Sequence, residues 1–215
     1  LEARGPGAPA IYGSVLSSMD PKTGAYMGMS PESDLLAAGS IEMAKYLHLP
    51  DSVGGFGSTA KIPGVQASLE HALAAMVCAN YGGEVVNGLG EPAGSTLLSY
   101  EQILLDHEIT AMVIKIFQGF RVDGGELAVD LIEKVGIGHN YLGQRHTLDR
   151  MRSIFVPMLW DTSPYDAWAG KGKKDPMAIA REKTEWILKN HEPRSLPADT
   201  VRRLDEIVRD SAKTG

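Results

Sequence analysis

The sequence predicts an α/β protein built on a parallel sheet, and two observations carry this prediction. First, a short β-branched or aromatic run is followed by a helical pattern three times in succession, between about residues 10 and 120. Consecutive parallel strands need a crossover connection, and a helix supplies it. Second, each run ends in glycine or small polar residues, as strands do where a loop begins.

The first unit consists of "AIYGSVLSS" (10–18) and a helix from about residue 32 to residue 47. Asp20-Pro21 breaks the strand pattern. Ser30 is expected to cap the helix, with Pro31 at its first position.

The second unit pairs a glycine-rich strand, "DSVGGFGSTA" (51–60), with the helix "GVQASLEHALAAMVCAN" (64–80). This helix is apolar on almost every face, which predicts burial on several sides. Cys78 lies within it and is expected to act as a small hydrophobic residue.

The third unit joins the strand "GEVVNGLG" (83–90) to a long helix over 99–120. Ser99 and Gln102 have the spacing of a capping box at the start of this helix. Apolar residues follow at helical spacing: Ile103, Leu104, Met112, Val113, Ile116 and Phe117.

The pattern changes after residue 120. Residues 124–138 indicate a short amphipathic helix, and 147–161 a helix or a last strand. Residues 175–190 and 197–212 are polar helical patterns with one narrow apolar stripe each, which is typical of surface helices.

Composition narrows the class of protein. A chain of 215 residues can form one domain with a full core. The first ten residues lack the basic and apolar regions of a secretory leader, and no apolar segment approaches the roughly 20 residues of a membrane helix. The single cysteine fits a reducing compartment, and the net charge of −6 argues against nucleic acid as the main partner. We therefore expect a cytoplasmic protein.

Two architectures suit these units: an open doubly wound sheet, or the C-terminal part of a larger (β/α)8 barrel, which needs eight units. The segment "GGFGSTAK" has neither the glycine spacing of a dinucleotide-binding turn nor the Gly-Lys-Ser/Thr of a P-loop. In either architecture the carboxyl ends of the strands meet at one edge, where sites form. His139 and His146 have no third ligand at a suitable spacing, so no metal site is predicted.

Four stretches of the sequence resemble a known family. They are "IYGSVLSSMDPKTGAYMGMSPESDLLAAGSIEMAKYLHLP", "GSTAKIPGVQASLEHALAAMVCAN", "GLGEPAGSTLLSYEQILLDHEI" and "GHNYLGQRHTLDRMRSIFVPMLWDTSPYDAW". Together they look like the C-terminal half of the trimethylamine methyltransferase family, the corrinoid-dependent methyltransferases. The resemblance implies that 1–160 are the C-terminal strands and helices of a (β/α)8 TIM barrel, and that 161–215 are a helical extension of the same domain.

The resemblance also implies an activity. Such enzymes bind a methylated amine at the barrel mouth and pass one methyl group to the Co(I) of a corrinoid (cobalamin) carried by a separate protein. Archaeal trimethylamine members carry pyrrolysine, whereas all 215 letters here are standard. This difference suggests the branch that acts on quaternary amines such as glycine betaine, unless a standard letter has replaced pyrrolysine. No cofactor is expected to be covalently bound, and a homo-oligomer is expected.

The family chemistry assigns hypothetical roles to residues near the predicted strand ends. A substrate cation is stabilised by aromatic faces and by carboxylates, so Glu91 and Asp20 are candidate counter-charges. Glu91 and Asn87 are the candidate catalytic residues, and Asn87 is expected to orient the substrate. Lys61 is expected to pair with a substrate carboxylate. The remaining candidate substrate-binding residues are Tyr12, Phe56, Ser58, Gly88 and Tyr100.

Structural alternatives remain for these residues. Asp20 before proline is equally suited to an Asx turn, Glu91 to a solvated position, and Phe56 and Tyr12 to a core. A different class of function also stays open, in which the chain is a non-catalytic module that binds a corrinoid protein or a second subunit. Its interface anchors would be the tryptophans of "MLWD" and "TEWIL".

Overall fold

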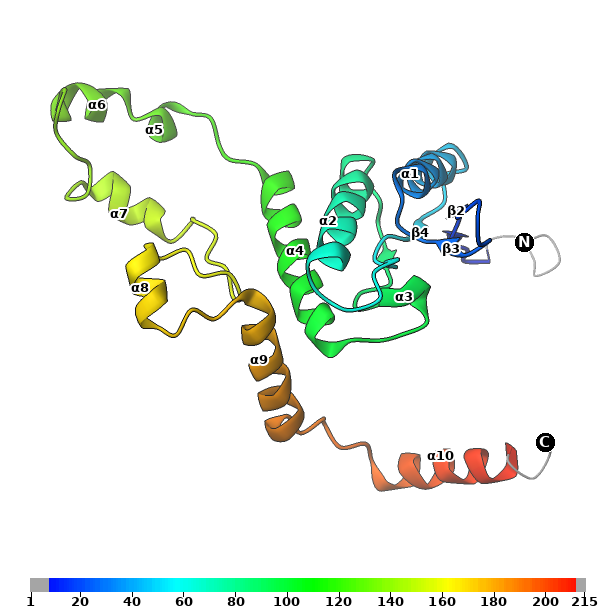
Figure 1. Cartoon of the computed structure of the whole chain (residues 1–215). Coiled ribbons are helices and arrows are strands. Elements are labelled where there is room, and N and C mark those ends of the chain that lie inside the picture. Colours follow the sequence, from blue (N-terminus) through cyan, green and yellow to red (C-terminus); the bar gives the residue numbers. More distant parts are fainter. Residues whose placement is uncertain (1–7, 212–215) are drawn as a thin grey trace. The chain divides into compact units, whose positions relative to one another are not determined.

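The computed structural model describes residues 8–211, which form five short strands and ten helices (Figure 1). The lead-in at 1–7 and the last four residues lie outside the described part. The chain divides into two compact units, the first ending at Thr184 and the second beginning at Glu185. Each unit is described by itself below.

A three-stranded parallel sheet lies at the centre of the first unit. It consists of β1 (Tyr12–Ser14), β4 (Asp51–Gly54) and β5 (Val86–Asn87), in the order β1-β4-β5. Beyond the strands, an isolated parallel bridge joins Gly57 to Glu91. The predicted α/β class and parallel pairing are confirmed. The strand order does not reverse within residues 8–211, so the described part has no switch point of a doubly wound sheet.

Helices α1 (Pro31–Tyr46) and α2 (Val65–Asn80) pack on the same face of this sheet. Val53 of β4 is fully buried and contacts both Ile41 of α1 and Cys78 of α2. Because side chains alternate along a strand, the neighbouring residues Ser52 and Gly54 point to the opposite face. The sheet therefore has one face covered by helices and one that the described helices leave open.

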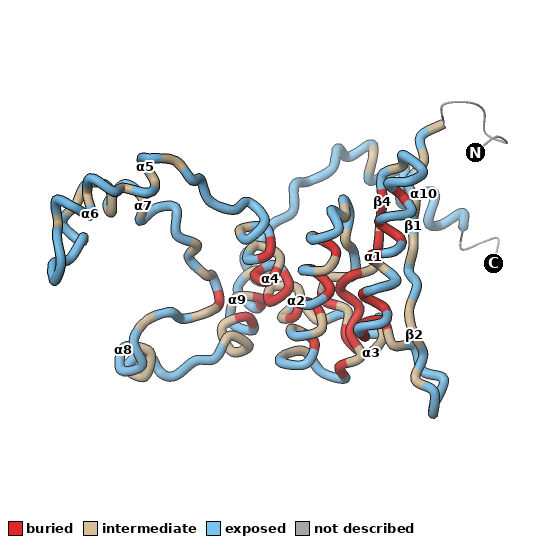
Figure 2. The backbone as a smooth tube through the Cα atoms, turned by 90° about the horizontal axis from the view of Figure 1, so that it is seen from above, coloured by how far each residue is buried: buried red, intermediate tan, exposed pale blue. Residues whose placement is uncertain are grey.

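Helix α4 (Tyr100–Gln118) packs along α2 and completes the core. Phe56, Ala75, Ile109 and Val113 form one buried cluster between them. The Oγ atom of Ser99 accepts the N–H of Gln102, which confirms the predicted cap. Figure 2 shows the buried residues concentrated in α1, β4, α2 and α4.

One local prediction was wrong, and another was correct but incomplete. The α2 helix is not buried all round, because Val65, Leu69 and Leu73 are exposed on its outer side. The predicted break at Asp20 is the turn of an antiparallel hairpin, formed by β2 (Ser18–Met19) and β3 (Tyr26–Met27).

The segment after α4 consists of short helices. The single helix predicted over 124–138 is divided into α5 (Gly124–Leu127) and α6 (Val129–Val135), because Ala128 adopts a left-handed conformation with φ of 49°. The predicted element at 147–161 begins as a helix, α7 (Arg145–Met151), and contains no strand. A further helix, α8 (Tyr165–Gly170), follows it.

Helix α9 (Pro176–Asn190) contributes its first half to the first unit. Ala180 forms a buried cluster with Leu105 of α4 and with Leu159. Glu108 of α4 is buried and accepts the N–H of Met158 at 2.9 Å, which fixes the same segment. Trp160, one of the predicted interface anchors, is partly buried and packs against this cluster.

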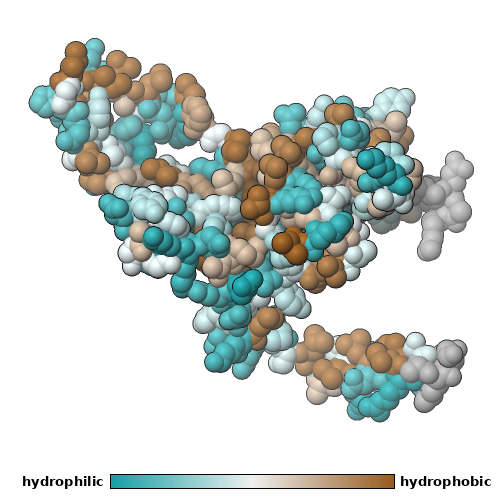
Figure 3. Space-filling view, viewed as in Figure 1, coloured by the Kyte–Doolittle hydropathy of each residue, from teal (hydrophilic) through white to brown (hydrophobic). Residues whose placement is uncertain are grey.

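The second unit contains α10 (Ala198–Ser211), a strongly amphipathic helix (Figure 3). Its apolar residues Val201, Leu204, Ile207 and Val208 are exposed. Trp186 of the predicted "TEWIL" anchor is also exposed, at 65 %. In the described part of the chain no helix has the length and apolar character that a membrane span requires.

Candidate functional site

A small pocket lies at the carboxyl edge of the parallel sheet, where the loops after the strands meet. Its volume is about 40 Å³. Three of the predicted site residues line it together: Asn87, Gly88 and Glu91. The other lining residues come from the segment after β1, from the hairpin and the residues after it, from β4 and its loop, and from α3 (Pro92–Ser95): Val15, Leu16, Tyr26, Gly28, Met29, Gly54, Gly57 and Ser95.

Asn87 is the last residue of β5 and lies on the face of the sheet away from the helices. It is in register with Gly54, and its amide Nδ2 donates to the Oγ atom of Ser52 at 3.2 Å. Its backbone oxygen accepts from Gly55 and Phe56, which fixes the strand end. Gly54 lies beside the amide, where a Cβ would be 3.9 Å from the Oδ1 of Asn87, and the exposed amide can present hydrogen bonds to a ligand.

Glu91 is half-buried and its carboxylate has no hydrogen-bond or ion-pair partner among residues 8–211. Its backbone is nevertheless fixed, because its oxygen accepts the N–H of Ser58 at 2.8 Å. A carboxylate that is partly withdrawn from water and unpaired attracts a cation. Glu91 therefore has the properties predicted for a counter-charge.

Tyr26 supplies an aromatic wall that sequence reasoning missed. It belongs to β3, and the hairpin places its side chain against Gly28 and Gly94 at the pocket rim, where a Cβ built on Gly28 would lie 2.6 Å from the ring. The signal was present in "GAYMGMS", where glycines flank an aromatic residue, but the hairpin that orients it was not predicted.

Asp20 has a local structural role. Its Oδ1 accepts the N–H of Lys22 at 2.7 Å and that of Thr23 at 3.1 Å. These hydrogen bonds form the Asx turn that was the structural alternative to a counter-charge role. These backbone hydrogen bonds hold the pKa of the carboxyl below its usual value. Asp20 thus closes the hairpin that carries Tyr26 and does not line the pocket.

The polar groups of the loop after β4 are engaged in hydrogen bonds within this chain. Ser58 is fully buried and donates to Glu70 of α2 at 2.6 Å, and both the N–H and the Oγ of Thr59 donate to the same carboxylate at 2.9 Å. Lys61 is exposed and donates to the backbone oxygen of Thr59. Neither Ser58 nor Lys61 lines the pocket, so the structure does not bring them together with Glu91 as ligand-binding groups.

The three predicted aromatic walls lie elsewhere. Phe56 is 2 % exposed and packs in the core, edge-on to His71 at 5.4 Å between ring centroids. Tyr12 is at the amino end of β1, opposite the end that forms the pocket. Tyr100 begins α4 and is exposed.

Gly88 and Gly90 are required by internal contacts. Both have positive φ, 97° and 78° respectively. A Cβ on Gly88 would lie 3.2 Å from the backbone of Phe56, and one on Gly90 would lie 2.3 Å from Ile103. The close approach that these glycines permit is between two parts of this chain.

A larger cavity of about 300 Å³ lies between α2, α4 and β5. Its walls are mostly apolar, with Glu84, His107 and Thr110 as the polar exceptions. It lies on the helix side of the sheet and contains none of the unpaired strand-end groups. We therefore assign the candidate site to the smaller pocket at the carboxyl edge.

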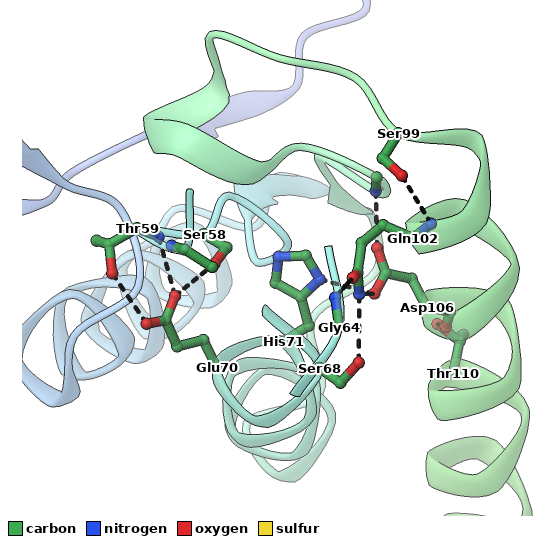
Figure 4. Close-up of polar contacts among 12 residues, drawn as sticks. Ser58, Thr59, Gly64, Ser68, Glu70, His71, Ser99, Gln102, Asp106 and Thr110 are labelled. Carbon is green, nitrogen blue, oxygen red and sulfur yellow. Dashed lines mark hydrogen bonds and ion pairs between the residues drawn. The ribbon is translucent and has the colours of Figure 1, made fainter. Parts of the chain in front are cut away.

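A buried polar network supports the loop after β5 (Figure 4). Asp106 and Gln102 of α4 and His71 of α2 are all fully buried, and the carboxylate of Asp106 accepts the N–H of Gly90 at 2.7 Å. Sequence reasoning missed Asp106, and it assigned Gln102 to a capping box only. The available signal was two polar residues within the apolar stripe of α4, since positions 102, 105, 106 and 109 share one helix face.

The predicted capping box at the start of α4 is only partly formed. The side chain of Gln102 does not return to the N–H of Ser99; its Oε1 accepts the N–H of Gly64 instead, at 2.9 Å. The N–H of Ser99 donates to Gly90. Only the serine half of the predicted box is formed.

Residues 8–211 contain no group of three or more His, Cys, Asp or Glu side chains arranged to hold a metal ion. The Nε2 atom of His146 lies 2.9 Å from the backbone oxygen of Gly125, so this histidine has a local hydrogen-bond partner.

Comparison with known proteins agrees with the resemblance found in the sequence. The family model described as trimethylamine methyltransferase (MTTB) matches residues 2–215. The trimethylamine methyltransferase MttB of Methanosarcina barkeri is 36 % identical over 203 residues, which are 94 % of this chain and 41 % of that protein. MttB of Desulfitobacterium hafniense (strain DCB-2) is 35 % identical over 205 residues, covering 95 % and 41 %.

A glycine betaine methyltransferase of Desulfitobacterium hafniense (strain Y51) is 32 % identical over 213 residues, which are 97 % of this chain and 44 % of that protein. The chain thus spans less than half the length of these relatives. The match over almost every residue shows that the chain belongs to the trimethylamine methyltransferase family.

Proposed function

We propose that the chain forms part of a methyltransferase that moves a methyl group from a methylated amine to the Co(I) of a partner corrinoid protein. One observation carries the proposal: the unpaired carboxylate of Glu91, the amide of Asn87 and the ring of Tyr26 line one pocket at the carboxyl edge of a parallel sheet. Relatives named for trimethylamine and for glycine betaine support the substrate class.

The proposed chemistry asks little of the protein in proton transfer. A quaternary amine leaves without being protonated, so the enzyme needs to hold the C–N bond in line with the acceptor and to exclude water. The corrinoid supplies the nucleophilic cobalt that accepts the methyl group. Glu91 would attract the ammonium, Tyr26 would offer an aromatic face, and Asn87 would fix the orientation.

The pocket is too small to enclose a substrate alone, which fits a site completed by residues outside this chain. We propose that the three parallel strands are a sector of a (β/α)8 barrel. An unreversed strand order with helices α1 and α2 on one face supports this, because every strand of such a barrel has its helix outside. The open face, with Asn87 and Gly54, would then face the barrel interior.

A homo-oligomer also remains a proposal. The exposed apolar residues of α2 and α10 are compatible with it. The molar mass of the full-length protein in solution, measured by light scattering, tests this expectation.

The activity is tested with the full-length protein and its corrinoid partner reduced to Co(I). Trimethylamine, glycine betaine and related amines are added in turn, and the absorbance of methyl-Co(III) is followed. We expect one of these amines to methylate the cobalt. If none does, the chain is better explained by the second reading, a module that binds a corrinoid protein or a second subunit without catalysis.

A further inference from the structure

We propose that Asp106 is a positioning residue: from inside the core it holds Gly90, and through Gly90 it sets the loop that carries Asn87 and Glu91. The proposal rests on the proposed function, because the loop matters through the pocket assigned to it. Asp106 lies on α4 and touches no part of that pocket.

Asp106 is a fully buried carboxylate with both oxygens engaged (Figure 4). Its Oδ2 accepts the N–H of Gly90 at 2.7 Å. Its Oδ1 accepts from Nε2 of Gln102 at 2.7 Å and lies 2.7 Å from Nδ1 of His71. Burying a carboxylate is unfavourable unless donors surround it, so these three donors stabilise one definite position of the group.

Gly90 connects Asp106 to the loop. Its N–H is held by Asp106, and its oxygen accepts the N–H of Ser99 at 2.9 Å. Its φ of 78° and its contact with Ile103 admit only glycine without strain. Both backbone groups are thus fixed by α4 and its cap, immediately before Glu91.

The hydrogen bond of His71 toward the loop runs through Asp106, while its ring also packs edge-on against Phe56. Its Nδ1 faces the carboxylate, so this nitrogen carries the proton that is donated. Its Nε2 is buried and has no hydrogen-bond partner in the described part of the chain. The ring therefore serves to supply one donor to Asp106 from α2.

This arrangement separates the groups that hold the loop from the groups that meet a ligand. The backbone at Gly90 is fixed from the core, while the side chain of Glu91 remains unpaired in the pocket. Displacing a reacting group by about 1 Å can reduce turnover roughly a hundredfold, so loss of this hold is expected to act on turnover more than on substrate affinity.

The test uses the full-length protein with its corrinoid partner and the substrate that supports transfer. Asp106→Asn replaces an acceptor by an amide that cannot accept from all three donors. His71→Leu removes one donor, and His71→Asn retains a donor at nearly the same place. Glu108→Gln is the matched control, because Glu108 is also a buried carboxylate of α4 but binds Met158.

Three readouts are compared: kcat and KM, the thermal midpoint, and amide hydrogen exchange of 86–91. In Asp106→Asn we expect kcat to fall at least about tenfold with KM changed less than about threefold, and exchange of 86–91 to accelerate. His71→Leu should show a smaller version of both effects, and His71→Asn should restore them. Glu108→Gln should lower the midpoint while leaving kcat and the exchange of 86–91 near wild type.

The proposal is overturned if Asp106→Asn folds with wild-type exchange in 86–91, or if its kcat falls no further than that of Glu108→Gln. Should Asp106→Asn fail to fold, equal behaviour of His71→Leu and His71→Asn would overturn it. If the wild type transfers no methyl group, the proposed function fails separately, and the exchange data still decide whether Asp106 holds the loop.

Discussion

The loops after β4 and β5 are neighbours, yet they use their polar side chains in opposite ways. Each loop is held by a buried or half-buried carboxylate from the helix that follows it: Glu70 of α2 holds residues 58–59, and Asp106 of α4 holds Gly90. In the first loop the side chains of Ser58 and Thr59 themselves donate hydrogen bonds to Glu70. In the second loop the backbone of Gly90 is held, and the carboxylate of Glu91 stays unpaired.

This difference shows why residue type and strand-end position together do not identify a site. Ser58 and Glu91 both follow strands and both are polar, but only Glu91 has a free functional group at the pocket. A side chain can bind a ligand when the fold fixes its backbone by other means. Four predictions test the contrast, from the largest expected effect to the smallest.

Glu91→Gln removes the charge and preserves the shape of the side chain. We expect kcat/KM of the full-length enzyme to fall at least about tenfold, mainly through KM, because the counter-charge that binds the substrate cation is lost. The thermal midpoint should not change, since the carboxylate has no partner in residues 8–211 to lose. A wild-type kcat/KM in this variant would remove Glu91 from the site.

Glu70→Gln should destabilise the protein by about 2 kcal/mol at neutral pH, because hydrogen bonds to a charged acceptor are weakened. Burial acts to raise the pKa of Glu70, but hydrogen bonds from Ser58, Gln66 and Thr59 outweigh it and hold the pKa below 4.5. A lowered acid pKa contributes stability above the unfolded value that is lost as pH falls through the folded value.

Denaturant unfolding of Glu70→Gln and wild type at pH 7 and at pH 3.5 measures this contribution. The difference between them should be large at pH 7 and should shrink at pH 3.5. A difference independent of pH would mean that Glu70 acts through packing alone.

Ser58→Ala should lower stability by about 1 kcal/mol, since it removes one buried hydrogen bond to Glu70. Turnover per folded molecule should remain within about twofold of wild type. A loss of kcat/KM as large as that of Glu91→Gln, with unchanged stability, would indicate that Ser58 binds the ligand.

Asp34→Asn tests a carboxylate whose pKa is shifted in the opposite direction from that of Glu70. Burial, and then the charge of Glu70, raise the pKa of Asp34 to about 6. Its Oδ1 is buried and has no partner among residues 8–211. A raised acid pKa means that the native state binds the proton more tightly, so wild-type stability should fall as pH rises from about 4 to 6.

Asp34→Asn should therefore be more stable than wild type at pH 7, and should lose that advantage near pH 4. Thermal midpoints of both proteins across this range provide the measurement. A variant that is less stable than wild type at pH 7 would contradict the assignment of an unfavourable buried charge.

The sequence was sufficient for the parts of the fold that local patterns specify. Ser30 and Ser99 were recognisable as caps, and the three strand-helix units followed from hydrophobic periodicity. Asn87 and Glu91 were found because a parallel sheet brings its strand ends to one edge. These inferences need only residues that are close in the chain.

The remaining features depend on long-range contacts that periodicity does not encode. Tyr26 lies at the pocket only through the β2–β3 hairpin, and Phe56 is a core residue because it packs between α2 and α4. Gln102 has the spacing of a capping box, yet its side-chain oxygen accepts the N–H of Gly64, 38 residues away. Burial of polar groups is decided by such distant partners.

The central claim is that Asn87, Glu91 and Tyr26 form the surface that receives the methylated cation. A crystal structure of the full-length protein with a quaternary amine that cannot transfer its methyl group tests it most directly. We expect the ammonium within about 6 Å of the Tyr26 ring and next to the carboxylate of Glu91. An amine bound in the cavity between α2 and α4, with nothing at Glu91, would contradict the account.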